Sequence, residues 1–552
     1  MKRLIKKFFS GWRIIAVIFT FALAYFGLIF NLYNVQFNKR AIYKSQAESQ
    51  QKATGVLDPM RGEIFFTDKN NNSTAVALNK EFPYIFAVPE EIKNPKGVAI
   101  TIGKILNLSA DELEKKFNKP NDSFELILLK ATQEQVGEVK DLNIKGIYIK
   151  NQISRFYPFE TLASHLIGFV GLNNEKSLDT LTNAEGKYGV ESFFNDILFG
   201  VAGKLTGSKV IDGENIQLTI DRNIQAQSEQ ILKKLVIDKG AAGGSIIVQD
   251  PKSGKILTMA SYPDFNPNDY SKYDIKNFLN PVVQAVYEPG SVFKIITMSA
   301  GIDSGKITPD TSYVDTGYAI INGRRIENWD HKAHGRLTMT DVIKQSINTG
   351  TIFAEKQTGH EIFKSYLKNF GLDVLTGIKL PGEVRGNLSN LNNGREVNYA
   401  TASYGQGVAV TPIEMINAAS AIANGGVLMK PILLADDKPE VVRRVISEDT
   451  ARKVTQMMVS AVIANKIANV PNYNVAGKTG TAFIPDFGRN GYTDQVISTY
   501  IGYAPAFDPK FIALIKLERA KDAPLAGTTV VPAFRELAGY ILNYYNVAPD
   551  KI

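Results

Sequence analysis

A long apolar run lies close to the amino terminus. It extends from Ile14 to Tyr33 and is interrupted by little more than Thr20 and Asn31. A helix of this length, rising about 1.5 Å per residue, covers the hydrocarbon core of a bilayer, which is roughly 30 Å thick. The pattern predicts a single transmembrane helix over residues 14–35.

Cations precede this run, among them Lys2, Arg3, Lys6 and Lys7. They favour a cytoplasmic location for residues 1–13, which would place the rest of the chain outside the membrane. The alternative is a cleaved signal peptide, because Ala22-Leu23-Ala24 is an A-x-A site. The apolar run continues past that site, which favours an uncleaved anchor in the cytoplasmic membrane.

Residues 36–240 mix short strands and helices with glycine-rich connections. The pattern predicts a strand after the turn at Arg61-Gly62-Glu63, a helix over 111–116 beginning near Ser109, and a helix over 224–234. An alternating strand over 216–220 precedes that last helix. No catalytic constellation is present here, so this part is interpreted as an elongated mixed α/β spacer, a pedestal that could bind partners.

A change of pattern at Ala241-Ala242-Gly243-Gly244 suggests the start of a second domain, residues 241–552. Its predicted strands are 245–249, 255–260, 474–476, 496–503 and 511–517, followed by a helix over 531–544. The first two form a hairpin through Asp250 to Gly254. Strands at both ends of a segment with helices between them predict an α+β domain with an antiparallel sheet.

Composition excludes several kinds of chemistry. The 552 residues contain no Cys and four His, so disulfides, thiolate metal sites and Cys nucleophiles are excluded. His331 and His334 form an H-x-x-H pair without a third ligand nearby, which is more typical of a solvated loop than of a metal site. The net charge is +8, but no basic block carries interleaved aromatics, so no nucleic-acid partner is expected.

The first chemical motif is Ser291-Val292-Phe293-Lys294, which follows Pro289-Gly290. The apolar residues after it predict a buried helix from Ser291 to Ser304. Ser291 and Lys294 are three apart and share a face. Burial favours the neutral form of Lys, which could then take the serine proton.

The second motif is Ser346-Ile347-Asn348. Residues two apart do not share a helix face, so their side chains converge only if this segment is a turn between helices.

The third motif is Lys478-Thr479-Gly480-Thr481. On an edge strand, Lys478 and Thr479 could hold a carboxylate, while Gly480 would let another backbone approach closely.

Both outer motifs have a second copy elsewhere in the chain. Ser365 to Lys368 repeats S-x-x-K, but it lies within an amphipathic helical pattern and lacks the Pro-Gly lead-in, so we expect it at the surface. Lys252-Ser253-Gly254 repeats the third pattern inside the predicted hairpin turn. Neither copy is a candidate site.

The three motifs, in this order, resemble the S-x-x-K, S-x-N and K-T-G signature of penicillin-binding proteins and serine β-lactamases. Further stretches resemble class B penicillin-binding proteins, which carry a single anchor, a pedestal or dimerisation domain and a transpeptidase domain. These stretches are Arg61 to Ile64, Arg155 to Pro158, Ala163 to Gly168, Gly189 to Glu191, Thr219 to Asp221, Tyr404 to Gly407 and Thr411-Pro412. Val292 stands where the family commonly has Thr.

The resemblance implies roles for the motif residues in cross-linking cell-wall peptides. Ser291 would be the acylated nucleophile, Lys294 its base, Ser346 a proton relay and Asn348 a substrate ligand. Lys478, Thr479 and Thr481 would bind the terminal carboxylate of a D-Ala-D-Ala stem peptide. Gly480 would line the same strand. The backbone N–H groups of Ser291 and Thr481 would form the oxyanion hole. No metal or cofactor is implied, and β-lactams would be inhibitors.

Alternatives remain open within and outside this class. Tyr287-Glu288 before Pro289-Gly290 resembles the septal, cell-division type, with a membrane glycosyltransferase and other division proteins as expected partners, more than the elongation type. A D,D-carboxypeptidase or β-lactamase would use the same serine. A binding receptor or division scaffold with little turnover would keep the fold without the reaction.

Overall fold

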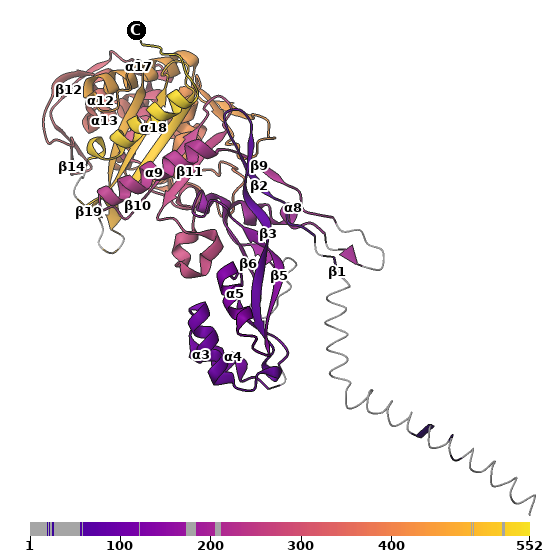
Figure 1. The fold of residues 1–552 in the computed structure, drawn as a ribbon. Helices are drawn as coiled ribbons and strands as arrows, with labels where there is room; N and C mark the ends of the chain where they lie inside the picture. The colour runs from indigo at the N-terminus through magenta and orange to yellow at the C-terminus, as the bar shows by residue number, and fades with distance from the viewer. Residues whose placement is uncertain are drawn as a thin grey trace, which may run out of the picture. The chain divides into compact units, whose positions relative to one another are not determined.

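The computed structural model describes residues 19, 21, 25, 26, 56–57, 59–120, 122–172, 184–201, 203–204, 211–486, 488, 491–521 and 525–551. Most of the predicted anchor, residues 14–35, and all of residues 1–13 lie outside this set. Among the described residues, no helix is both long and apolar enough to cross a membrane. Residues 61–199 and 213–552 form one compact unit (Figure 1), and the described residues up to 60 and within 200–212 belong to a second unit.

A five-stranded antiparallel sheet organises the carboxyl-terminal part of the large unit. Its strands, in spatial order, are β11 (Ile256–Tyr262), β10 (Gly243–Gln249), β20 (Phe511–Glu518), β19 (Gly491–Ala504) and β18 (Ala476–Asp486). The two ends of the segment therefore meet in one sheet with helices inserted between them. This confirms the α+β prediction, and it leaves β18 at an edge.

Two helices cover one face of this sheet. α9 (Arg222–Asp238) and α18 (Val530–Tyr544) lie side by side across the strands (Figure 1). Period-two alternation along β20 explains the arrangement, because Phe511, Ala513 and Ile515 share the core of these helices. Helix α9 thus packs on the sheet although it lies before residue 241. The domain boundary at residue 241 stays a prediction.

The opposite face of the sheet carries the helices that hold the site. Ile512 and Leu514 of β20 point to this side and pack with α11 (Lys294–Asp303), α16 (Pro412–Ala423) and α17 (Glu448–Asn465). Residues Lys294–Ile302 of α11 are all buried, as its nearly continuous apolar pattern predicted. Smaller helices complete this layer: α10 (Pro281–Gln284), α12 (Met339–Gln345), α13 (Asn348–Thr358), α14 (His360–Asn369) and α15 (Glu396–Ala402).

Short two-stranded ribbons border the helical layer. They are β12 (Ser312–Asp315) with β15 (Gly335–Thr338), β13 (Tyr318–Ile321) with β14 (Arg324–Glu327), and β16 (Val427–Met429) with β17 (Val441–Arg444). The β13–β14 ribbon contributes a backbone group to the site described below.

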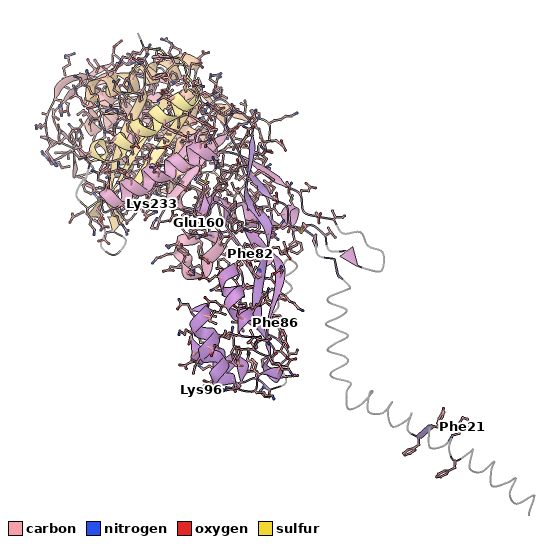
Figure 2. The ribbon with its side chains drawn as sticks, viewed as in Figure 1. Phe21, Phe82, Phe86, Lys96, Glu160 and Lys233 are labelled. Atoms are coloured by element: carbon pink, nitrogen blue, oxygen red, sulfur yellow. The ribbon has the colours of Figure 1, made fainter. Side chains whose placement is uncertain are left out.

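A second sheet lies in the amino-terminal part of the large unit. Its strands are β4 (Glu125–Leu128), β3 (Ser73–Ala87), β2 (Ile64–Thr67) and β9 (Ile216–Asp221), with β5 (Ile147–Phe156) also paired to β3. Phe82 and Phe86 lie along the long strand β3 (Figure 2), where Phe86 stacks on Phe124 with ring centroids 5.0 Å apart. α3 (Pro95–Leu106), α4 (Ala110–Phe117) and α5 (Gln133–Asp141) pack against this end of the sheet. The strand after Arg61 and the helix after Ser109 were both predicted.

A buried ion cluster joins three of the stretches that resemble a pedestal. Glu191, on α7 (Gly189–Phe193), accepts from Arg61 Nε at 2.8 Å and from Arg155 Nε at 2.6 Å. Tyr157 OH donates to the same carboxylate at 3.2 Å. Burial alone raises the pKa of Glu191, but the two guanidinium charges and their hydrogen bonds outweigh it, so its pKa is lowered.

Remaining elements complete both units. In the large unit they include α6 (Ser164–Ile167), α8 (Asn195–Phe199) and the paired strands β6 (Val170–Leu172) and β7 (Ala184–Gly186). In the small unit, β1 (Val56–Leu57) pairs with β8 (Gly203–Lys204).

The positions of two predicted elements need correction. The strand predicted at 474–476 begins only at Ala476 and continues to Asp486 through the third motif. Glycine, lysine and proline have low strand propensity, so the local pattern hid a strand that is defined by its ladder to β19. The helix predicted over 224–234 is longer, because Asp221 caps it by accepting from the backbone N–H groups of Asn223 and Ile224.

Candidate active site

Ser291 lies on a single turn of 3-10 helix, Gly290–Phe293, which runs directly into α11. The predicted helix is therefore present, with a tighter first turn. Ser291 is partly exposed, while its neighbours Val292 and Phe293 are buried. The backbone of Gly290, with φ of 59°, makes the turn that brings the serine to the surface of an otherwise buried helix.

Lys294 is fully buried and reaches the second motif. Its Nζ donates to the Ser346 carbonyl oxygen at 2.6 Å and to Asn348 Oδ1 at 2.8 Å. Burial lowers the pKa of Lys294 well below its ordinary value, and the charge of Lys478 lowers it further. Within the described residues no carboxylate forms an ion pair with this lysine. The environment favours a neutral amine that can accept a proton.

Ser346 occupies the predicted turn between two helices. α12 ends at Gln345, Ser346 adopts the left-handed conformation with φ of 58°, and Asn348 begins α13. This reversal turns Ser346 and Asn348 toward the same amine, since Lys294 Nζ lies 3.4 Å from Ser346 Oγ and 2.8 Å from Asn348 Oδ1. The left-handed conformation of Ser346 ends α12, as it commonly does at a helix C-terminus.

The amide of Asn348 has a defined orientation. Its Nδ2 donates to the Glu327 carbonyl oxygen at 3.0 Å, on β14, so its Oδ1 faces Lys294. Sequence reasoning missed Glu327, and no signal in the chain marks it, because it acts through its backbone. The ribbon β13–β14 thus positions the second motif.

Lys478 lies on the edge strand β18 and is also buried. Its Nζ donates to Ser346 Oγ at 2.9 Å and to the Thr479 carbonyl oxygen at 2.9 Å. Burial lowers the pKa of Lys478 to about 7. The Ser346 hydroxyl therefore lies between two lysines, each within hydrogen-bond reach, which is an arrangement suited to passing a proton.

The other residues of the third motif border the nucleophile loop. Thr479 Oγ1 lies 3.4 Å from Lys478 Nζ, and Thr481 Oγ1 accepts from Ala526 N at 3.5 Å. Gly480 permits a close approach, because a Cβ built there would lie 2.8 Å from the Pro289 carbonyl oxygen. Strand β18 and the serine loop are in direct contact through this glycine.

A second glycine braces the serine loop from another side. Gly290 N donates to the Gly405 carbonyl oxygen at 3.0 Å. A Cβ on Gly405 would lie 2.2 Å from the Gly290 carbonyl oxygen, so no side chain fits there without displacing the loop. Gly405 belongs to the stretch Tyr404 to Gly407, which the sequence analysis singled out only by resemblance.

Of the patterns that the sequence analysis set aside, the two motif copies lie on other elements, whereas His331 contacts Glu327, whose carbonyl group holds Asn348. Ser365 and Lys368 are exposed on α14, and Lys252 is exposed in the β10–β11 turn. His331 Nδ1 pairs with Glu327 Oε2 at 2.7 Å, and His334 Nε2 lies 3.1 Å from Asp330 Oδ2.

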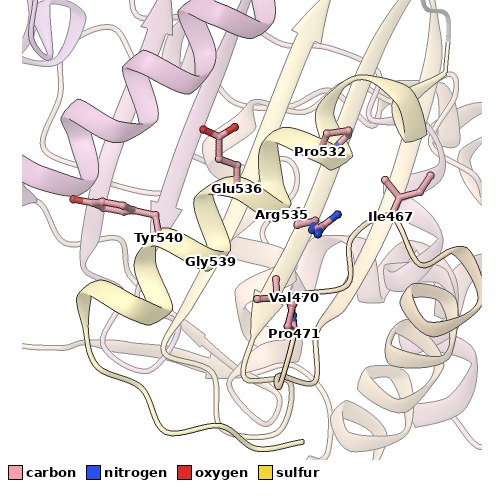
Figure 3. A pocket seen from close by; sticks show the side chains of 8 residues that line it. All are labelled: Ile467, Val470, Pro471, Pro532, Arg535, Glu536, Gly539 and Tyr540. Carbon is pink, nitrogen blue, oxygen red and sulfur yellow. The ribbon is translucent and has the colours of Figure 1, made fainter.

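A surface pocket of about 470 Å³ lies elsewhere in the domain (Figure 3). Arg535, Glu536, Gly539 and Tyr540 of α18 form one side, and the loop from Ile467 to Pro471 forms the other. None of the three motifs lines it. The chemistry of the molecule is therefore concentrated in the Ser291 cluster rather than in this hollow.

Comparison with known protein families matches two segments of the chain. Residues 56–230 match the penicillin-binding protein dimerisation domain, and residues 244–538 match the penicillin-binding protein transpeptidase domain. Together the two matches cover both sheets and all three motifs.

Individual relatives extend the similarity over nearly the whole chain. Stage V sporulation protein D of Bacillus subtilis is 32% identical over 531 residues, which cover 90% of this chain and 80% of that protein. Peptidoglycan D,D-transpeptidase FtsI of Escherichia coli is 27% identical over 517 residues, covering 89% and 85%.

A solved structure shares the fold. The crystal structure of penicillin-binding protein 3 from Mycobacterium tuberculosis, complexed with aztreonam, superposes with a TM-score of 0.70 at 26% sequence identity. The similarity covers 90% of this chain and 99% of that one.

Proposed function

The chain belongs to class B of the penicillin-binding protein family, and on that basis we propose that it is a peptidoglycan D,D-transpeptidase acting through an acyl-serine intermediate. Its substrates are stem peptides that end in D-Ala-D-Ala, and β-lactams acylate the same serine. The three motifs supply every side chain that the reaction needs, without a cofactor.

Acylation begins with proton removal from Ser291. Neutral Lys294 takes the proton, and Oγ attacks the carbonyl carbon of the D-Ala-D-Ala bond. Backbone N–H groups of Ser291 and Thr481 stabilise the oxyanion. Ser346 passes a proton to the leaving nitrogen, the C–N bond breaks, and D-alanine departs.

Substrate binding uses the second and third motifs. Lys478, Thr479 and Thr481 bind the terminal carboxylate, and Gly480 keeps the strand close to the serine loop. Asn348 binds the substrate backbone. An amine of a neighbouring stem then attacks the ester, forming the cross-link and releasing Ser291.

One observation carries this proposal: Lys294 is buried, is hydrogen-bonded to Ser346 and Asn348 of the second motif, and forms no ion pair with a carboxylate of the described residues. A lysine held only for structure would need a compensating charge, because burial penalises the ammonium form. Here the neighbouring acceptors are neutral, which suits a base.

Covalent labelling with a fluorescent penicillin tests the proposal. Wild-type protein should be labelled at one site, and Ser291→Ala should not be labelled. Ser365→Ala is the matched control, because it removes the serine of the exposed S-x-x-K copy, and it should be labelled like wild type. Equal labelling of Ser291→Ala and wild type would refute the assignment.

Product analysis separates transfer from hydrolysis. Incubation with uncross-linked peptidoglycan should give cross-linked dimers, whereas a carboxypeptidase would give only shortened stems. A protein that is labelled by penicillin but forms neither product would be a receptor or scaffold.

Two finer features belong to the same proposal. The apolar run over 14–35 anchors the chain in the cytoplasmic membrane with residues 1–13 inside, and deletion of residues 1–35 should move the protein to the soluble fraction. The septal role is supported by Tyr287-Glu288 before Pro289-Gly290-Ser291. A fluorescent fusion should gather at division sites, and uniform lateral labelling would favour elongation.

A further inference from the structure

Beside the nucleophile lies a carboxylate that the proposed reaction does not use. Glu288 is three residues before Ser291 on the same loop and is partly buried. Its Oε1 accepts from Gly407 N at 3.0 Å, and Tyr492 OH donates to its Oε2 at 3.1 Å. Among the residues that the structure describes, no Lys, Arg or His forms an ion pair with it.

Other buried carboxylates in the domain have their bonding accounted for by the fold. Glu518 pairs with Lys516 at 2.7 Å. Glu414 lacks a cation, but it accepts from Gly386 N at 2.7 Å and from Thr411 N at 2.8 Å as the capping box of α16. Glu288 caps no helix, and its carboxylate keeps acceptor capacity toward solvent, since a carboxylate can accept about four hydrogen bonds.

The residues around Glu288 contact the segments that carry the first and third motifs. Gly407 closes the stretch that braces the serine loop, through the bond from Gly290 N to the Gly405 carbonyl. Tyr492 begins β19 and pairs with Pro485 at the far end of β18, the strand that carries the third motif. The carboxylate therefore connects the stretch at Gly407 with the far end of the strand pair that carries the third motif, and its charge also reaches the Tyr404 hydroxyl.

We propose that Glu288, with Tyr492, forms a subsite for the ammonium group of a diamino acid residue in a stem peptide. The proposal rests on the transpeptidase function above and deepens it. A partly desolvated carboxylate that pairs with no cation of the described residues, and that accepts from an aromatic hydroxyl, is complementary to an alkylammonium ion. The surrounding burial makes such a charge-assisted contact stronger than it would be in water.

Two stem peptides could supply the ammonium group. The donor peptide carries it on the residue before D-Ala-D-Ala, and the acceptor peptide carries it as the future nucleophile. In the second case the ammonium must lose one proton to water. The amine nitrogen then bonds to the acyl carbon as the bond to Ser291 Oγ breaks, and the proton that the nitrogen gives up is balanced by the proton that Oγ regains.

The experiment compares Glu288→Gln with wild type on paired ligands. In the donor arm, a lysine-containing pentapeptide is compared with its Nε-acetyl form by the rate of acylation. In the acceptor arm, the ratio of amide product to hydrolysis product is measured with a lysine tripeptide amide or with D-alanine, whose ammonium lies on the α-carbon. The exposed Glu448→Gln serves as matched control and should behave like wild type in both arms.

If Glu288 binds the ammonium group, Glu288→Gln should lower the acylation rate or the product ratio only for ligands that carry this group. Glu288→Gln should lower the rate or ratio for the lysine ligand by roughly tenfold to a hundredfold while leaving the acetylated or D-alanine comparison nearly unchanged. The arm in which this occurs identifies donor or acceptor as the source. Tyr492→Phe should give a smaller loss in the same arm.

Two results would overturn the subsite. One is an equal loss for both members of each pair, together with slower penicillin labelling, which would make Glu288 a positioning residue only. The other is no loss in either arm. Failure of wild type to react with penicillin would refute the transpeptidase function itself, so the two failures are distinguishable.

Discussion

Two regions of this molecule bury cations, and they do so in opposite ways. In the pedestal, Arg61 and Arg155 share the buried carboxylate of Glu191. In the cleft, Lys294 and Lys478 are buried just as deeply, yet their partners among the described residues are hydroxyl, amide and carbonyl oxygens. The first cluster keeps its charges, whereas the second lowers the pKa of both lysines.

The difference separates a structural use of buried charge from a chemical one. A guanidinium is always protonated, so a paired arginine can only hold segments together. A lysine without a carboxylate is destabilised as a cation and becomes a base at neutral pH. The pedestal cluster therefore joins three separate stretches of chain, while the lysine cluster at Ser291 has the lowered pKa values that the proposed proton transfer requires.

Lys294→Met gives the largest expected effect. It should reduce the rate of acylation by penicillin by about 10²- to 10⁴-fold, because the base is removed. The free energy of unfolding should stay the same or rise, since a buried amine without a counter-ion is replaced by an apolar side chain of similar length. Stopped-flow acylation and chemical denaturation measure the two quantities.

The matched control is Lys368→Met, which removes the lysine of the exposed S-x-x-K copy on α14. Its acylation rate should equal that of wild type. A large loss of stability in Lys294→Met would show instead that this lysine is structural, and the contrast between the two regions would fail.

Glu191→Gln gives the largest expected effect on stability. It should cost about 3–5 kcal/mol in unfolding free energy, because two buried guanidinium groups lose their counter-ion. Denaturant titration measures this loss. The acylation rate of the molecules that remain folded should be close to that of wild type; selective loss of acylation with unchanged stability would contradict the structural role.

Lys478→Met tests the contrast through the pH dependence of the unfolding free energy. The pKa of Lys478 is about 7 in the folded chain, below its ordinary 10.5. Between these values the unfolded chain binds one more proton than the folded chain, so the contribution of Lys478 to stability rises with pH, by at most about 1.4 kcal/mol per unit. The variant lacks this gain, so its stability relative to wild type should fall as pH rises from 7 to 10.

Denaturation of both proteins across that range measures the difference. Both proteins carry Lys294→Met in this comparison, because the charge of Lys478 lowers the pKa of Lys294 and the titration of Lys294 would otherwise differ between them. A difference that is independent of pH would mean that Lys478 stays charged, as a paired cation would.

Asp449→Asn should have the smallest effect. Asp449 pairs with Arg452 and Lys453 on the exposed side of α17. Exposed ion pairs contribute little, since water screens them and ordering the side chains costs entropy. Thermal melting should not distinguish this variant from wild type, and it is the reference against which the buried clusters are measured.

Local patterns in the sequence predicted the parts of the site that depend on neighbouring residues. The apolar run after Ser291 predicted a buried helix, and the two-residue spacing of Ser346 and Asn348 predicted a turn between helices. The resemblance to penicillin-binding proteins then implied that these segments and Lys478 come together.

The missed parts depend on distant segments. Glu288 meets Tyr492 across 204 positions of sequence, and Glu327 contributes only a carbonyl group, which every residue possesses. The strand through Lys478 lacks alternation and contains glycine and proline, so only its pairing with β19 makes it a strand. Such contacts arise from tertiary packing between distant segments, so no local periodicity in the sequence predicts them.

The backbone contacts at Gly405 and Gly480 have a consequence for how this cleft can evolve under an inhibitor. A mutation that adds a side chain at either position pushes on the serine loop, so it would impair wall synthesis together with drug binding. Heritable change in drug response is thereby directed to side chains at the border of the cleft, such as the exposed Phe483 and Tyr492. The close backbone contacts at Gly405 and Gly480 therefore limit which positions can change without loss of the enzyme's own reaction.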